Sequence, residues 1–189
     1  MRLCLIRHFA PEVPPDVCYG QTDLCLKDSA EDRACRASSL RQQLDALVGP
    51  ATPVFSSPLR RCTETAMALS AEIILDTRLR ELHFGDWEMQ AWDAIGAAGL
   101  DAWAADLAGF RPPGGETGYE VQQRALGWLR EASVRHDQIV AVTHGGVMRV
   151  LQAHHQALPG AQWLQLRYEY GQLLCLDFEA GQIHAAPVQ

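Results

Sequence analysis

Leu3-Cys4-Leu5-Ile6-Arg7-His8 is the stretch from which the fold can be predicted. Four apolar residues are followed at once by a cation and an imidazole, and loop residues continue to Pro11. A short continuous apolar run is typical of an interior strand of a parallel sheet, and such sheets bind ligands beyond the carboxyl ends of their strands. We therefore expect a buried strand that delivers Arg7 and His8 to a ligand-binding crevice.

A second stretch of the same kind occurs late in the chain. Ile139-Val140-Ala141-Val142-Thr143 is the strongest predicted interior strand, and His144-Gly145-Gly146 follows it before a helix begins. Two predicted strands thus end in histidine. Since the carboxyl ends of parallel strands meet at one edge of a sheet, we expect His8 and His144 to converge.

The remaining segments alternate between helical and strand patterns. Ser29 is a predicted helix cap, Ser57 is another before a helix at 59–71, and Thr117 with Glu120 forms a capping-box pattern. The order of elements predicts a three-layer α/β/α fold with a mostly parallel central sheet and a small helical cap. The predicted segments are a helix over 29–49, strands at 53–56 and 73–75, an ordered loop at 78–88, short helices within 91–107, a helix over 117–136, and a closing hairpin of 164–166 with 173–178. We predict a single domain, 1–189, with the cap inserted at roughly 82–116.

Composition limits the class of protein. A chain of 189 residues with 48% apolar content can bury one sizeable core. The net charge of −7 argues against nucleic-acid and membrane partners, which need a basic surface. No signal peptide and no membrane-spanning run is visible, and the six cysteines include no C-x-x-C pair. We expect a cytoplasmic protein with reduced thiols, and the sequence predicts no oligomeric state.

Arg60 and Arg61 fall in the first turn of the helix predicted at 59–71. Cations are disfavoured beside the positive end of a helix dipole, whereas anions bind well there. The pair makes sense if an anion occupies the start of this helix. The alternative is a solvated pair of charges with no ligand.

Phosphoryl transfer is the chemistry that this set of residues suits. Arg7, Arg61 and His144 can donate to phosphate oxygens, and a neutral His8 can attack phosphorus. Glu81 or Glu116, on nearby loops, can protonate the leaving oxygen and then activate water. The alternative for any single histidine is a hydrogen-bonded structural role. Neither an H-E-x-x-H motif nor another closed metal-site spacing is present, so we expect no metal and no cofactor.

Five blocks, in order, resemble the histidine phosphatase superfamily, which includes the phosphoglycerate mutases. They are Leu5-Ile6-Arg7-His8, Ser56-Ser57-Pro58-Leu59-Arg60-Arg61-Cys62, Leu79-Arg80-Glu81-Leu82 with Phe84-Gly85-Asp86-Trp87-Glu88, Pro113-Gly114-Gly115-Glu116 and Val142-Thr143-His144-Gly145-Gly146. The resemblance implies a phosphoglycerate mutase-like fold and a metal-independent phosphomonoesterase acting on a small phosphorylated metabolite. It implies His8 as the phosphorylated nucleophile, Glu81 as the proton donor, and Arg7, Arg61, His144 and Gly145 as phosphate ligands.

Departures from the family pattern bear on the substrate. Phe9 stands where glycine is usual, and the segment Val17-Cys18-Tyr19-Gly20-Gln21-Thr22-Asp23-Leu24 resembles the alpha-ribazole phosphatases of cobalamin biosynthesis. That resemblance makes alpha-ribazole 5′-phosphate the first predicted substrate. Three residues of this segment, together with Glu116, are candidates for contacting it: Tyr19, Gly20 and Thr22. The alternatives are a phosphoglycerate mutase, a broad small-metabolite phosphatase, or a catalytically silent module that binds a phosphorylated ligand.

Overall fold

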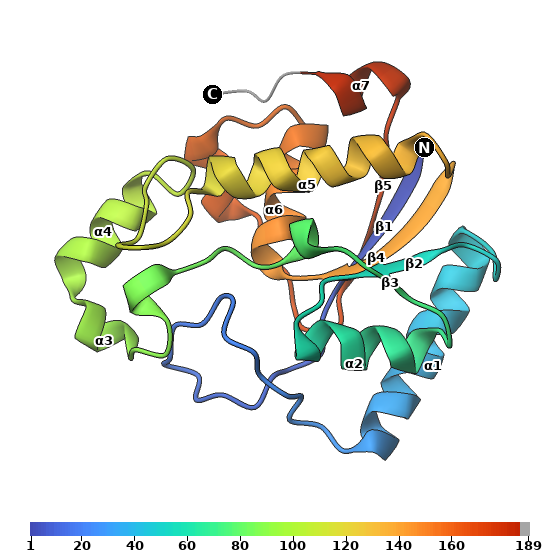
Figure 1. Ribbon diagram of the computed structural model, residues 1–189, viewed down its shortest axis with the longest axis horizontal. Coiled ribbons are helices and arrows are strands. Elements are labelled where there is room, and N and C mark those ends of the chain that lie inside the picture. The colour runs from blue at the N-terminus through green and yellow to red at the C-terminus, as the bar shows by residue number, and fades with distance from the viewer. Residues whose placement is uncertain (186–189) are drawn as a thin grey trace.

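A mostly parallel sheet forms the centre of the computed structural model, which describes residues 1–185 (Figure 1). Its strand order is β3-β2-β4-β1-β5, and all neighbouring strands are parallel except β5, which is antiparallel to β1. The expected architecture is confirmed. The strands are β1 (Arg2–Arg7), β2 (Val54–Ser56), β3 (Ile74–Leu75), β4 (Gln138–Thr143) and β5 (Leu173–Asp177).

Helices cover the sheet on both faces, with α1 (Ala30–Leu47) and α2 (Arg60–Leu69) on one and α5 (Gly118–Ser133) and α6 (Gly145–His155) on the other (Figure 1). Side chains of β1 alternate between the two layers. Leu3 and Leu5 join the core under α5 and α6, whereas Cys4 and Ile6 join the core under α1 and α2. Both faces of β1 are therefore buried, which explains its continuous apolar run.

Two predicted helix starts are confirmed and one differs. The Ser29 side chain accepts a hydrogen bond from the Asp32 amide, and Thr117 forms a capping box with Glu120. Leu59, not Ser57, occupies the cap position of α2 and caps without its side chain. The Ser57 hydroxyl instead accepts from the Leu59 amide, 3.3 Å away, and contacts the ring of His144.

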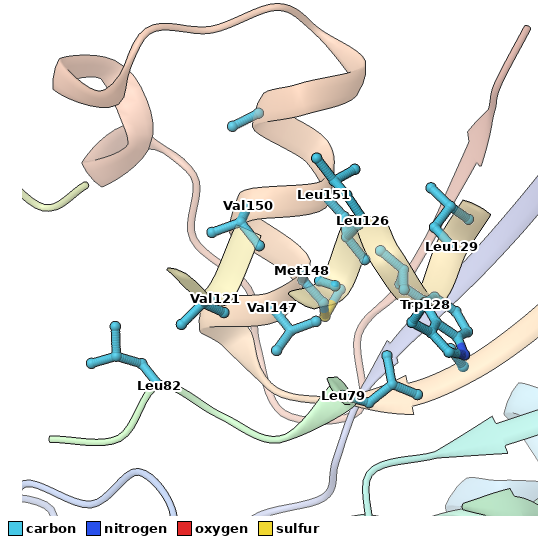
Figure 2. Packing of buried hydrophobic residues seen from close by; sticks show 14 of the residues in the cluster. Leu79, Leu82, Val121, Leu126, Trp128, Leu129, Val147, Met148, Val150 and Leu151 are labelled. Carbon is cyan, nitrogen blue, oxygen red and sulfur yellow. The ribbon is translucent and has the colours of Figure 1, made fainter. Parts of the chain in front are cut away.

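A cluster of aliphatic side chains joins α5, α6 and the loop that follows β3 (Figure 2). Leu79 and Leu82 from this loop are both buried against the helices. Their burial on either side of Glu81 fixes where that carboxylate lies. The helix residues labelled in Figure 2 are Val121, Leu126, Trp128, Leu129, Val147, Met148, Val150 and Leu151.

Two short helices, α3 (Trp92–Ile95) and α4 (Ala97–Ala105), lie away from the sheet, beyond the ends of α5 and the first loop (Figure 1). Trp92 and Trp103 stack across them with ring centroids 6.2 Å apart. Short helical turns η1 (Thr77–Leu79), η2 (Gly85–Trp87) and η3 (Gly160–Gln165), with the last helix α7 (Ala180–His184), complete the fold. None of the helices in residues 1–185 has the length and apolarity that a membrane span requires.

The predicted closing hairpin is wrong. Leu164 and Leu166 do not belong to a strand, because the chain from Gly160 forms η3 around the buried Trp163. Strand β5 alone reaches the sheet, and it pairs with β1. The two-residue spacing of the leucines therefore reflects a tight helical turn and not strand alternation.

The expectation of reduced thiols throughout is wrong for one pair of cysteines. Cys4 of β1 and Cys175 of β5 form a disulfide, because the antiparallel register places them directly opposite one another. Their separation of 171 residues hides this pairing in the sequence. The other four cysteines, Cys18, Cys25, Cys35 and Cys62, are free.

Candidate active site

His8 and His144 meet at the carboxyl ends of β1 and β4. The parallel register pairs Arg7 with Thr143, so each strand ends at the same level and the next residue of each is a histidine. The two ring centroids are 5.1 Å apart. The His8 side chain is buried and His144 is fully buried. The expected convergence of two imidazoles from distant parts of the chain is present in the structure.

The hydrogen bonds of His8 fix its tautomer. Nδ1 lies 2.7 Å from the carbonyl oxygen of Phe9, which can only accept, so Nδ1 carries the proton. Nε2 is left with its lone pair and accepts from Nε of Arg61 at 3.3 Å. Burial, followed by the nearby charge of Arg61, holds the pKa of His8 well below its usual value. The result is a neutral imidazole at neutral pH, whose Nε2 lone pair meets only the N–H of Arg61.

The side chain of Phe9 points away from this site. It is fully buried in the core under α1 and α2, and the Arg36 guanidinium lies over its ring at 4.6 Å. Its backbone contributes to the site through the carbonyl that holds His8, and its amide donates to Thr65. Phenylalanine in place of the usual glycine therefore leaves the space in front of His8 open.

Arg61 reaches His8 from the first turn of α2 and is fully buried. Besides its contact with His8, it donates to the backbone carbonyls of Gly20 and Thr22. Arg60 points outward instead and pairs with Glu64 on the surface. Only the second of the two adjacent arginines belongs to the site, and it joins the loop at 20–22 to the imidazole.

Arg7 has a hydrogen-bond donor without an acceptor among the described residues. Its Nη1 donates to the carbonyl of Tyr168 at 2.6 Å, and the ring of Tyr170 lies 3.9 Å from its guanidinium carbon. Its Nε is buried and, within the described residues, has no hydrogen-bond partner. A buried N–H without an acceptor is costly, and an oxyanion bound in front of Gly145 would satisfy it.

Glu81 lies at the border of the same crevice. Its carboxylate accepts from the amides of Leu82 at 2.9 Å and Gly146 at 3.0 Å. A Cβ on Gly146 would lie 2.2 Å from the carboxylate, so a side chain there would displace Glu81 from this position. The crevice is about 490 Å³ in volume, within the range of small-molecule sites. Its lining includes Arg7, His8, Tyr19, Glu81, Phe84, Trp92, Trp103, Gly145, Gly146, Arg149, Tyr168 and Tyr170.

His144 is held from the other side by α2 and the residues before it. Its Nε2 lies 2.9 Å from the Ser57 hydroxyl and 3.3 Å from the thiol of Cys62. Burial, then the charges of Arg61 and the neighbouring His8, lowers its pKa well below the usual value. Ser57 was not among the predicted site residues, although its place at the end of β2 put it at the same sheet edge.

The predicted substrate-contacting loop is clamped by Glu88. This carboxylate accepts from the amides of Gly20, Gln21 and Thr22, and from the Thr22 hydroxyl at 2.6 Å. Tyr19 lies in the crevice wall and shares a 2.6 Å hydrogen bond with the hydroxyl of Tyr170. Tyr19 therefore faces the crevice, whereas Gly20 and Thr22 support Arg61 from behind.

Glu116 has a different environment from the one its prediction requires. Its carboxylate forms an ion pair with Arg124 and also accepts from the amide of His83 and the side chain of Gln21. It does not line the crevice. Glu116 braces the loop that carries Glu81, since Arg124 also donates to the carbonyl of Glu81.

Glu88 should make stability depend on pH. Burial acts to raise its pKa, but the hydrogen bonds from Thr22 and three backbone amides outweigh burial and lower the pKa below the usual value. The ionised carboxylate therefore stabilises the fold above the pKa of the unfolded chain, and this contribution is lost as the pH falls through the folded-state pKa. We expect the stability advantage of the wild type over Glu88→Gln to shrink between about pH 6 and pH 3 in urea titrations. An advantage that grows toward acid pH would contradict this assignment.

Gly20 should tolerate no side chain. A Cβ there would lie 2.0 Å from the carbonyl oxygen of Leu82 and 2.8 Å from Glu88. Gly20→Ala must shift the loop that holds Arg61, and we expect a loss of about 1–3 kcal/mol in unfolding free energy. Gly127→Ala is the matched control, because nothing lies near its Cβ in the middle of α5, and we expect it to stabilise the protein by about 0.5–1 kcal/mol. Equal effects of the two substitutions would contradict the packing argument.

Several crevice residues were absent from the sequence predictions, among them Arg149, Tyr168 and Tyr170. Arg149 could have been found, because it stands one helical turn after Gly145 on the helix predicted there. The tyrosines could not, because their approach depends on the turn between η3 and β5. In residues 1–185, no three His, Cys, Asp or Glu side chains are grouped as metal ligands would be.

A mostly parallel α/β sheet that gathers imidazoles and guanidiniums at its carboxyl edge defines an enzyme that handles phosphoryl groups. The sequence of the chain matches the protein-family model of the histidine phosphatase superfamily (branch 1) over residues 3–188. The chain therefore belongs to the histidine phosphatase superfamily, and its similarity to phosphatases makes it a phosphoric monoester hydrolase.

Relatives of two substrate classes resemble the chain. Glucosyl-3-phosphoglycerate phosphatase of Mycolicibacterium vanbaalenii is 32% identical, over 86% of this chain and 77% of its own. The structure of a mycobacterial glucosyl-3-phosphoglycerate phosphatase superposes with a TM-score of 0.80 at 29% identity, covering 92% of this chain and 88% of that one. Adenosylcobalamin/alpha-ribazole phosphatase of Salmonella typhimurium is 26% identical, over 96% of this chain and 92% of its own.

Proposed function

We propose that the protein hydrolyses phosphomonoesters of small metabolites through a phosphorylated His8, without a metal. The observation that carries the proposal is the state of His8, whose Nδ1 proton is held by Phe9 while Nε2 keeps its lone pair. Such an imidazole can attack an electrophile without first losing a proton. A silent binding module has no need of a neutral, oriented imidazole, so this observation favours catalysis.

In the first step Nε2 of His8 attacks phosphorus, and the bond from phosphorus to the alcohol oxygen breaks. In this proposal the Nε–H of Arg7 and the charge of Arg61 neutralise the phosphoryl oxygens, with His144 and the Gly145 amide as further donors. For His144 to donate, its proton must lie on the ring nitrogen that faces the phosphate. The product is a phosphohistidine and a free alcohol.

Glu81 acts as the general acid in the first step and as the general base in the second. It gives its proton to the departing alcohol oxygen, and as a carboxylate it then takes a proton from the water that attacks phosphohistidine. The second step regenerates neutral His8 and protonated Glu81 and releases inorganic phosphate. The carboxylate accepts from the amide of Gly146 at the start of α6 and lines the same crevice as His8, which supports this role.

The segment 82–116 is proposed as a cap over the alcohol half of the substrate. It contributes aromatic side chains to the crevice wall, namely Phe84, Trp92 and Trp103. Aromatic walls can cover either a sugar or a flat base. The cap therefore restricts which alcohols enter, while the residues at the sheet edge bind the phosphate.

Two classes of substrate follow from the sequence and from the relatives. The segment at 17–24 favours alpha-ribazole 5′-phosphate, whereas the greater identity to glucosyl-3-phosphoglycerate phosphatases favours a phosphorylated glycerate. Values of kcat/KM for alpha-ribazole 5′-phosphate, glucosyl-3-phosphoglycerate and 3-phosphoglycerate would rank them. Interconversion of phosphoglycerates in place of phosphate release would assign the protein to the mutases instead.

The covalent intermediate is the direct test of the proposed function. Brief incubation with a ³²P-labelled ester and rapid quenching in alkali should trap label on His8, because phosphohistidine survives alkali and is lost in acid. The label should disappear on a chase with unlabelled substrate. Turnover with no label on His8 would reject the mechanism.

A further inference from the structure

Arg149 is a partly buried cation that the proposed mechanism does not use. It lies on α6, one turn after Gly145, and its side chain lines the crevice together with Arg7 and Glu81. Burial lowers its pKa, and the charge of Glu81 only partly offsets this effect. A guanidinium in such surroundings is costly unless an anion or several acceptors satisfy it.

The protein satisfies only part of this side chain. Its Nε donates to the carbonyl of Leu166 at 3.1 Å, which fixes the direction of the guanidinium. Among the described residues no carboxylate forms a salt bridge with it, and its two terminal nitrogens have no protein acceptor. These nitrogens form the planar pair of donors that suits a carboxylate.

Charge balance points to a second anionic group on the substrate. When a phosphate dianion is bound, Arg7 and Arg61 match its two charges. Glu81 must hold a proton at that stage in order to act as the acid, so it cannot neutralise its neighbour. Arg167 and Glu169 are both exposed crevice residues of opposite sign and offset one another. The crevice then has one positive charge with no negative partner, and that charge is on Arg149.

We propose that Arg149 forms a second anion-binding subsite, which takes a carboxylate on the alcohol half of the substrate. A single unmatched positive charge suits a carboxylate better than a second phosphate dianion. The proposal rests on the proposed function and refines it, because it selects phosphorylated hydroxy acids such as glycerate esters over alpha-ribazole 5′-phosphate, which has no carboxylate.

The test compares two esters that differ only at this group. In 3-phosphoglycerate carbon 1 is a carboxylate, and in glycerol 3-phosphate it is a hydroxymethyl group. We expect the wild type to favour the acid by about 10- to 100-fold in kcat/KM, the range that a charged hydrogen bond provides. In Arg149→Gln this preference should fall to near unity, and Arg149→Lys should retain part of it. Arg135→Gln, on the exposed surface beyond α5, is the matched control and should retain all of it.

Several results would overturn the proposal. Equal kcat/KM for the two esters in the wild type would do so even if Arg149→Gln failed to fold. Arg149→Gln could instead lower kcat/KM equally for both esters and shift the acid limb of the pH–rate profile. That result would show that Arg149 acts through Glu81. Calorimetric titration of His8→Ala with both esters gives a readout independent of turnover, and we expect tighter binding of 3-phosphoglycerate by at least about 10-fold. If the wild type hydrolyses no phosphomonoester, the proposed function fails, and this binding ratio still decides the subsite.

Discussion

Replacing His8 by alanine is expected to lower kcat by about 10⁴-fold or more, because no other group can form the covalent intermediate. His8 is the neutral imidazole that lines the crevice with its Nε2 unprotonated, whereas His144 is engaged by Ser57 and Cys62. Steady-state rates on p-nitrophenyl phosphate measure the effect. Because His8 is buried among polar groups, the variant should remain folded by circular dichroism.

The control for this experiment is His184→Ala. His184 is exposed at the end of α7 and does not line the crevice. We expect its rates to match those of the wild type. Retention of more than about 1% of wild-type kcat in His8→Ala would contradict the nucleophilic role.

Glu81→Gln is expected to produce an effect that depends on the leaving group. An alkoxide must be protonated as it leaves, so hydrolysis of alkyl phosphates should slow by about 10²- to 10⁴-fold. Nitrophenolate is stable without a proton, so p-nitrophenyl phosphate should lose about 10-fold or less in the first step. Burst kinetics separate the two steps, since the loss of the base also slows hydrolysis of phosphohistidine.

Glu72→Gln, at an exposed position before β3, is the matched control and should leave both rates unchanged. Equal losses on alkyl and aryl esters in Glu81→Gln would move the acid to another carboxylate. Glu116 is poorly placed to replace it, because Arg124 and the His83 amide already occupy its oxygens.

The centre of the fold could be predicted because it depends on local patterns. Strands β1 and β4 are buried on both faces, so their apolar runs are continuous. Polar side chains appear where each run ends, and they mark the carboxyl ends of the strands. Once the two strands are parallel neighbours, their register brings His8 and His144 together without further information.

The features that were missed depend on long-range geometry. The disulfide between Cys4 and Cys175 follows from the register of β5 against β1, and Tyr170 reaches Arg7 only because of the turn before β5. The surroundings of Glu116 could not be predicted for the same reason, since its ion pair with Arg124 depends on how α5 packs against the loop after β3. Sequence patterns identify which residues are charged but not which partner each charge finds.

The position of β1 between β4 and β5 has a consequence for biosynthesis. The strand that leads to the nucleophile leaves the ribosome well before the two strands that flank it, which begin at Gln138 and Leu173. At typical elongation rates the wait is on the order of ten seconds. During this interval an unpaired apolar segment depends on chaperones or on transient collapse, and the catalytic centre can form only after both flanking strands have been translated.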